Sequence, residues 1–336
     1  MRSQRILIVR LGAIGDVVNC LPLLNRLKNA DPQRYIAWAV EPKAYPILEG
    51  HRSIDKIFLF PRKEPWKIPQ FIAQIRQQRF DIALDLQRIL KSGLITLFSK
   101  APVRLGFDRS RCKEGNGLFT NQKIPSHPHS GVMLEQFLEF ADLLKVPPSP
   151  VEWKIAIPSE IHSWADKLLA PLSHPRIAIH LGASKPANRW RSERYLELAQ
   201  RIQKNWGAGI LFTGGIEEAE ASHKIKNSSN LFLNLVGKTN LKQTAAVLQR
   251  CDLVIGGDTG PIHLAVAMGT PVVTLFGAAN PQRTGPYGYT SWVVRKDLFC
   301  SPCGQRTCPL KTYACLEELR VDDVMGKVQS FLQNVT

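Results

Sequence analysis

The sequence predicts two α/β domains, each built on a doubly wound parallel sheet with helices on both faces. Its 336 residues exceed the roughly 150 of a common single domain. Short apolar runs, typical of strands covered on both faces, alternate with stretches of helical periodicity. This rhythm begins again after the proline-rich segment 146–150. We therefore expect an N-terminal domain over 1–150, a C-terminal domain over 151–320, and a helix in 321–336 that can cross back to the first domain.

The first half opens with a strand over 6–9, a turn containing two glycines over 11–16, and a helix with apolar residues at a spacing of three or four. Pro22 is expected to restart or kink that helix. A helix over 132–144 closes the half. The remaining strands are predicted over 35–40, 56–60 and 81–86.

The second half repeats the pattern. Strands are predicted over 176–181, 209–213, 232–235, 253–257 and 271–276, and helices over 195–204, from about 217, over 241–249, 264–268 and 321–332. Open parallel sheets bind ligands outside the carboxyl ends of their strands, so we expect the functional residues in the turns that follow the strands.

The charge balance concerns partners rather than the fold. Lys and Arg number 44 against 28 Asp and Glu, a formal net charge of +16, and residues 1–150 hold 23 basic and 13 acidic residues. Such an excess suits a phosphorylated substrate, an anionic membrane face or a nucleic acid. No helix-turn-helix, zinc-finger or RNA-recognition signature is present, so we expect no nucleic-acid partner. Without a long apolar run or a disulfide-type cysteine pattern, we expect a cytoplasmic protein.

The first turn, Gly12-Ala13-Ile14-Gly15-Asp16, lies where a doubly wound sheet places its ligand loop. It lacks the third glycine of the dinucleotide fingerprint, which argues against a bound dinucleotide. Asp16 has two interpretations. It is either a helix N-cap, which the spacing alone favours, or a catalytic base that takes a proton from an acceptor hydroxyl.

Two turns of the second half suit a diphosphate. Thr259, Gly260 and Ile262 follow a buried-type strand and open a helix, so their backbone N–H groups suit an anion. Lys185 and Arg189 follow another strand. They are either solvated surface cations or the charges that neutralise a diphosphate leaving group without a metal.

Seven motifs in order resemble glycosyltransferase family 9, the lipopolysaccharide heptosyltransferases. They are RLGAIGDVVNCLPLL, FDIALDLQ with ILKSGL, RLGF, HLGASKPANRW, TGGIEE, LVGKTNL and GGDTGPIHLAVAMGTPVVTLFGAANPQRTGPYG. The resemblance covers nearly the whole chain. It implies a GT-B architecture, in which two Rossmann-like domains face each other across a cleft. It also implies an inverting, metal-independent transfer of heptose from ADP-heptose, with no cofactor.

The resemblance also assigns residues. Asp16 matches the family's catalytic base, which replaces the interpretation of Asp16 as a helix cap. The resemblance also implies that the acceptor is an anionic lipid-linked saccharide of the lipid A–Kdo type at the inner face of the cytoplasmic membrane. Asn188 departs from the family, because many relatives have a lysine there; Lys185 or Arg189 is expected to replace it. The donor is expected to contact Gly15, Lys185 and Arg189. Its ribose is expected at Glu217 or Glu218, its adenine at Lys238 and Thr239, and its diphosphate at Asp258, Thr259, Gly260 and His263. The acceptor is expected to contact Arg62, Lys63, Lys91, Arg111 and Lys113.

The cysteines Cys300, Cys303, Cys308 and Cys315 form the pattern C-x2-C-x4-C-x6-C. Its spacing is not that of a common zinc module, and it contains no histidine. We expect either a reduced segment that stabilises a loop or a structural metal site, and no catalytic metal.

The alternatives in function are a relative that uses another nucleotide sugar in surface polysaccharide assembly and a GT-B-type epimerase or hydrolase. The oligomeric state is left open.

Overall fold

A computed structural model describes residues 3–125, 131–183, 185–220 and 232–335. The chain forms two compact units, Met1–Ala156 and Ile157–Thr336, so the division falls a few residues after the proline-rich segment. The terminal helix, which we expected to be able to cross back to the first domain, belongs to the second unit and packs there on α7 (Ser192–Trp206) and β11 (Val272–Leu275). The described helices include none that is long and apolar enough to cross a membrane.

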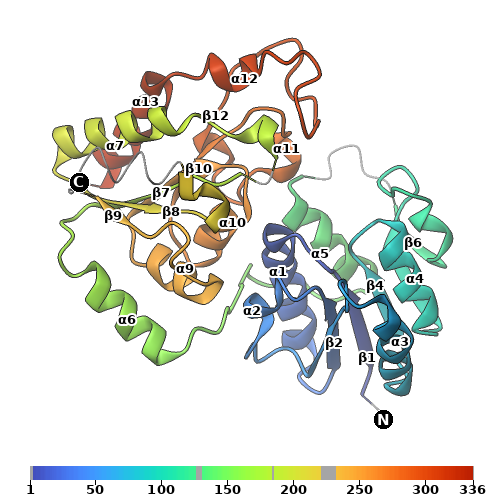
Figure 1. Ribbon diagram of the computed structural model, residues 1–336. Helices are drawn as coiled ribbons and strands as arrows, with labels where there is room; N and C mark the ends of the chain where they lie inside the picture. Colours follow the sequence, from blue (N-terminus) through green and yellow to red (C-terminus); the bar gives the residue numbers. More distant parts are fainter. Residues whose placement is uncertain (1–2, 126–130, 184, 221–231, 336) are drawn as a thin grey trace. The chain divides into compact units, whose positions relative to one another are not determined.

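The first unit is built on a six-stranded sheet in the order β3-β2-β1-β4-β5-β6 (Figure 1). Every neighbouring pair is parallel. The strands β1, β2, β3 and β4 correspond to the predicted runs, whereas β5 and β6 were not predicted. Their bounds are β1 (Arg5–Val9), β2 (Tyr35–Val40), β3 (Lys56–Leu59), β4 (Ile82–Asp85), β5 (Val103–Phe107) and β6 (Gln122–Ile124).

Two helix layers cover this sheet. The helices α1 and α5 pack together, and α3 and α4 contact each other; Figure 1 shows the two pairs on opposite faces. Helix α1 continues through the buried Pro22, so the restart expected there does not occur. The elements are α1 (Ile14–Ala30), α2 (Tyr45–Leu48), α3 (Ile68–Gln77), α4 (Leu90–Phe98), α5 (Met133–Leu143) and the short 3₁₀ turns η1 (Pro65–Lys67) and η2 (Asn116–Leu118).

The second unit repeats the design with the parallel order β12-β11-β10-β7-β8-β9. All predicted strands are present, and β12 is an addition. Their bounds are β7 (Arg176–His180), β8 (Gly209–Thr213), β9 (Leu233–Asn234), β10 (Leu253–Gly257), β11 (Val272–Leu275) and β12 (Val293–Val294).

The helices of the second unit largely follow the predicted periodicity. The polar helix expected from about residue 217 begins as a 3₁₀ turn, η4 (Ile216–Glu218), and its later part lies outside the described residues. The others are α6 (Ser159–Leu169), α7 (Ser192–Trp206), α9 (Leu241–Leu248), α10 (Gly260–Ala267), α11 (Pro281–Thr284), α12 (Ala314–Glu317) and α13 (Val321–Val335), with 3₁₀ turns η3 (Pro186–Asn188) and η5 (Thr290–Trp292).

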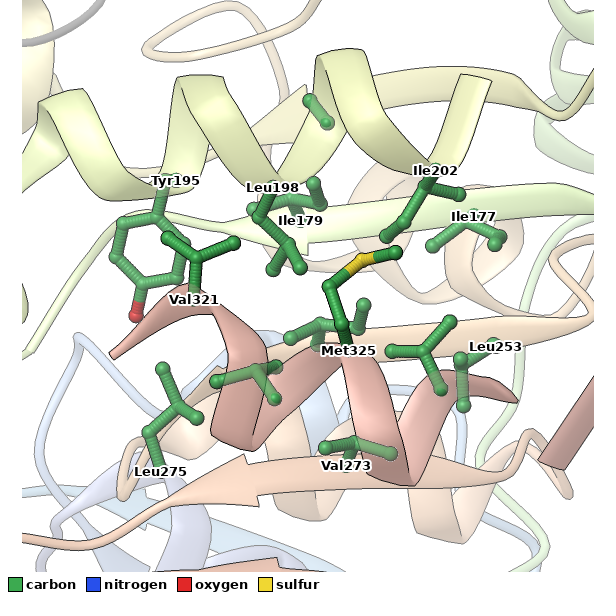
Figure 2. Packing of buried hydrophobic residues seen from close by; sticks show 14 of the residues in the cluster. Ile177, Ile179, Tyr195, Leu198, Ile202, Leu253, Val273, Leu275, Val321 and Met325 are labelled. Carbon is green, nitrogen blue, oxygen red and sulfur yellow. The ribbon is translucent and has the colours of Figure 1, made fainter. Parts of the chain in front are cut away.

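The core of the second unit lies between its sheet and the pair α7 and α13. Figure 2 shows Leu198 and Ile202 of α7 and Met325 of α13 pointing at strand residues such as Ile179 and Leu253. Both helices are amphipathic, so the buried stripe of each packs against the sheet and against the other helix. This packing explains why the chain keeps its last helix on the second unit.

We expect Leu198→Ala to destabilise the second unit by about 3 kcal/mol, because it removes a fully buried side chain and leaves a cavity. Gln200→Ala, on the exposed side of the same helix, is the control and should change the free energy of unfolding by less than about 0.5 kcal/mol. Urea unfolding measures both. Equal effects of the two substitutions would contradict the packing described here.

Candidate functional site

The residues singled out in the first unit lie after the carboxyl ends of its strands. Asp16 follows β1, Arg62 and Lys63 follow β3, Lys91 begins the segment after β4, and Arg111 and Lys113 follow β5. Because the sheet is parallel, all of these strand ends lie at one edge.

Asp16 lies in the first turn of α1 and forms an ion pair with Arg10. The N-cap of the helix is Ala13, so the interpretation of Asp16 as a cap is wrong. Arg10 is almost completely buried, and its guanidinium also donates to the carbonyl of Leu86 at 2.6 Å and faces the Phe137 ring at 5.5 Å. The pair engages Oδ2 of Asp16, whose side chain remains 32% exposed. A fixed guanidinium thus orients a carboxylate that solvent and substrate can reach.

A second carboxylate, which is buried, supports this edge. Asp85, the last residue of β4, is fully buried and accepts hydrogen bonds from Asn116 Nδ2 at 2.7 Å and from the backbone of Gln87 at 3.1 Å. Burial is the largest influence on its pKa and raises it. The Gln87 side chain in turn accepts from the backbone N–H groups of Leu11 and Gly12, at 3.0 and 3.3 Å. Asp85 therefore holds the turn that presents Asp16.

The acceptor candidates separate into two groups. Arg62 and Lys91 both contact Glu41, at 2.9 and 3.4 Å, at the end of β2, while Lys63 and Lys113 are exposed. Arg111, which the resemblance assigned to the acceptor, forms a third case because its side chain is largely buried. Its side chain is 12% exposed, and it donates to Asp108 and Glu139 and to the carbonyl of Pro125. Arg111 therefore serves the fold of the β5–β6 connection.

In the second unit, Asp258, Thr259 and His263 come together at the start of α10. Thr259 is the N-cap, and its side chain makes no capping hydrogen bond. Asp258 accepts from the Thr284 hydroxyl at 3.2 Å and lies 3.9 Å from His263 Nε2. The Asp258 carboxylate thus belongs to the loop's internal contacts, and the positive helix terminus at Gly260 is the part suited to an anion. The Ile262 N–H, expected to face an anion, donates to the Thr259 carbonyl.

The loop after β7 lies against this helix start. A Cβ on Gly257 would meet the Asn188 carbonyl at 3.1 Å, so glycine is what allows the close approach. Asn188 is buried and accepts from the Ala279 N–H at 3.2 Å, a structural role. Arg189 is 52% exposed and donates to the Ala183 carbonyl, and Lys185 Nζ lies 3.5 Å from the Gly304 carbonyl. Arg189 is therefore the cation of this loop that is most open to a ligand.

The loops after β8 and β9 also touch. Gly237 donates its N–H to Gly214 at 3.0 Å. Glu218 accepts from the Gly215 N–H at 2.9 Å and lies 4.0 Å from Arg189, whereas Glu217 is exposed. Lys238 donates to the Asn234 carbonyl, and the Thr239 hydroxyl contacts that of Thr244. The structure thus brings the donor candidates of the second unit to one edge of its sheet, while Gly15 is a buried residue of α1 in the first unit.

Comparison with known proteins identifies the family. Residues 68–314 match the model of glycosyltransferase family 9 (heptosyltransferase). The chain belongs to glycosyltransferase family 9. It is 31% identical over 338 residues, 96% of this chain and 95% of the relative, to the lipopolysaccharide core heptosyltransferase OpsX of Haemophilus influenzae.

Solved structures show the same fold. A family 9 glycosyltransferase from Veillonella parvula matches with a TM-score of 0.82 at 21% identity, covering 99% of both chains. E. coli ADP-heptose lipopolysaccharide heptosyltransferase II matches with a TM-score of 0.78 at 22% identity, covering 99% of this chain and all of the other. The predicted fold, with two α/β units each built on a doubly wound parallel sheet, is therefore confirmed.

In this family 9 chain the four clustered cysteines line one pocket together with Ala187 and Ala278. All four thiols are free, and backbone N–H groups of Tyr313 and Leu310 lower the pKa of Cys308. No group of three or more His, Cys, Asp or Glu side chains in the described part of the chain is arranged to hold a metal ion. The Gly304 N–H donates to Ala278 at 2.7 Å. The segment therefore braces the loops after β7 and β11.

His180, which the sequence prediction did not select, is buried at the end of β7 of this family 9 chain. Its Nδ1 lies 3.0 Å from the Thr213 hydroxyl, and burial lowers its pKa from 6.5 to about 4. A Cβ on Gly182 would lie 2.8 Å from His180 Nε2 and 3.3 Å from the Glu218 carboxyl. A neutral imidazole thus underlies the loop that leads to Arg189.

We expect His180 to make the second unit less stable in acid. Between pH 6.5 and about 4 the unfolded chain binds a proton at this histidine that the folded chain does not, so stability falls as the pH drops through this window. His180→Asn should reduce the loss of unfolding free energy between pH 7 and pH 5 by on the order of 1–2 kcal/mol. The exposed His174→Asn is the control for urea unfolding at both pH values, and an unchanged pH dependence in His180→Asn would contradict the assignment.

Proposed function

We propose that this family 9 glycosyltransferase transfers heptose from ADP-heptose to the inner core of lipopolysaccharide, with inversion at the anomeric carbon. The 31% identity to a lipopolysaccharide core heptosyltransferase over nearly the full length of both chains is the observation that carries this proposal. Further support comes from a solved E. coli heptosyltransferase WaaC with ADP-2-deoxy-2-fluoro heptose, which shares this fold with a TM-score of 0.73 at 21% identity over 97% of this chain and 99% of that one.

Asp16 is the general base in this proposal. Its carboxylate takes the proton of an acceptor hydroxyl while the hydroxyl oxygen attacks the anomeric carbon of heptose. The bond between that carbon and the diphosphate oxygen breaks, and ADP leaves with the electron pair. Arg10 is a positioning residue, because it is buried and fixes Asp16 Oδ2. Attack from the face opposite ADP gives inversion.

The departing ADP is stabilised by the second unit. The α10 helix start at Thr259 and Gly260 and the exposed Arg189 offer positive charge to the diphosphate, with Lys185 in the same loop. These groups let the reaction proceed without a metal or other cofactor. Glu217 or Glu218 binds the ribose, and Lys238 and Thr239 lie at the adenine.

The acceptor binds at the carboxyl edge of the first sheet. Arg62 and Lys91 share the single carboxylate of Glu41, so the trio keeps a net positive charge. Together with the exposed Lys63 and Lys113 it suits the carboxylates and phosphates of a lipid A–Kdo type saccharide. In this proposal the enzyme works in the cytoplasm at the inner membrane face.

Asp16→Asn should lower kcat by about 10²-fold or more while the affinity for ADP stays near that of the unchanged enzyme, since the base is lost and the donor loops are untouched. The control is Asp297→Asn, whose side chain is 90% exposed and pairs with Arg295. Transfer assays and calorimetry with ADP measure the two quantities. Full turnover by Asp16→Asn would remove Asp16 from its role.

Calorimetry should show that ADP binds more tightly than UDP or GDP, because the proposed donor is an adenine nucleotide. Arg189→Ala should weaken ADP binding by about tenfold through loss of one charge-assisted contact. Arg191→Ala, two residues away and paired with Glu317, should leave binding unchanged. Preference for another base would redirect the donor assignment, and consumption of donor without acceptor would favour an epimerase or hydrolase.

A further inference from the structure

Helix α4 of the first unit presents four large apolar side chains to solvent, while Ile95 is buried in the core. Leu90, Leu94, Leu97 and Phe98 are 43, 36, 37 and 47% exposed. Their spacing of four, seven and eight residues from Leu90 places them on one face of the helix, about 100° wide. A surface helix of a globular protein normally turns this stripe toward the core, so α4 is oriented the opposite way.

The inward face of α4 explains the orientation. Ser92 and Thr96 are completely buried. The Ser92 hydroxyl donates to the Ile89 carbonyl at 2.9 Å and accepts from Asn116 at 3.3 Å. The inward polar face is thus bound to the network around Asp85, and the leucines cannot turn inward without breaking it.

A second apolar residue extends the exposed face. Leu118 is 76% exposed and lies in η2, which packs against α4. Helix α4 and η2 pack closely because residue 93 is a glycine, and a Cβ at this position would lie 2.4 Å from the Phe119 ring. We call the set of Leu90, Leu94, Leu97, Phe98 and Leu118 the α4 patch. Contiguous apolar surface of this kind on a folded protein marks an interaction site.

The segment of the chain that carries the α4 patch is rich in basic residues. Residues 61–118 contain 12 basic and 5 acidic residues, so this segment holds +7 of the +10 carried by residues 1–150. Among the exposed basic side chains are Lys100, directly after α4, and Lys113, in the loop before Leu118. Each Lys or Arg near an anionic lipid surface contributes about 1 kcal/mol to attraction. A second copy of the chain would instead bring two positive surfaces together.

We propose that the α4 patch docks the enzyme on an anionic lipid surface, with its leucines and Phe98 in the interface and the surrounding lysines at the headgroups. This inference rests on the proposed function, which supplies the lipid-linked acceptor. It deepens that function by naming the surface that meets the lipid. Lys91 lies on α4 itself and reaches Glu41 and, through it, Arg62. Docking therefore places the proposed acceptor cations next to the headgroup layer.

The docking surface can be tested by sedimentation of the full chain with two kinds of vesicle. One contains phosphatidylcholine, and the other also contains the anionic lipid phosphatidylglycerol. We expect binding to the anionic vesicles that weakens with salt. The double variant Leu94→Gln, Leu97→Gln should partition to them at least tenfold less, because two side chains lose their apolar burial. Phe299→Ser with Leu310→Ser, which removes exposed apolar residues of the second unit, should bind as the unchanged chain does. Thermal unfolding should be unaltered in both variants.

The outcomes separate this inference from the proposed function. Equal vesicle binding by the α4 variant and the unchanged chain overturns the docking surface, whatever the transfer activity. A different result assigns the patch to a second copy of the chain: the unchanged chain does not bind vesicles but self-associates in light scattering, and the α4 variant does not self-associate. Normal vesicle binding by a chain that transfers no heptose overturns the proposed function and keeps the docking surface. On a short soluble acceptor, the α4 variant should keep its kcat.

Discussion

The ion pair between Arg10 and Asp16 is the contact on which the carboxyl edge of the first sheet depends. A buried guanidinium costs on the order of several kcal/mol unless its donors and charge are satisfied. Here the carbonyl of Leu86, the carboxylate of Asp16 and the ring of Phe137 offset the charge and engage both terminal nitrogens, whereas Nε is buried without a hydrogen-bond partner. These partners come from the end of β4, from α1 and from α5, so one side chain ties a strand end to both helices that cover that face. The position of Asp16 is therefore a property of the folded unit rather than of a free loop.

The donor edge of the second unit is built differently. Its loops approach one another through glycines and backbone hydrogen bonds, as at Gly257 beside Asn188 and at Gly237 beside Gly214. Its carboxylates are turned toward partners, Asp258 toward Thr284 and Glu218 toward the Gly215 N–H. This arrangement limits the negative charge exposed at this edge and leaves the α10 helix start and Arg189 as the features suited to an anion.

Long apolar strands and glycine turns were predictable because their patterns are local. The sequence prediction missed β5, since Arg104 and Gly106 interrupt its apolar alternation, and missed the two-residue β12 because it is shorter than any periodic signal. Arg10 escaped selection because a lone cation after a strand is usually solvated, and its burial depends on α5, more than a hundred residues away. Arg111 was selected for its charge, but its partner Glu139 lies 28 residues away and consumes that charge within the fold. Tertiary pairing, unlike periodicity, cannot be inferred from a single sequence.

The support of the turn before Asp16 and the apolar surface of α4 have one origin. Asp85 is a buried carboxylate, and its hydrogen-bonding partners include Asn116 and Ser92. To supply Ser92, the helix after β4 must turn its polar side inward, and its leucines are then exposed as a geometric consequence. An exposed leucine row is costly for a freely soluble protein and useful for one that works on lipid. The same buried carboxylate that fixes the turn before Asp16 thus also determines which face of the unit is apolar.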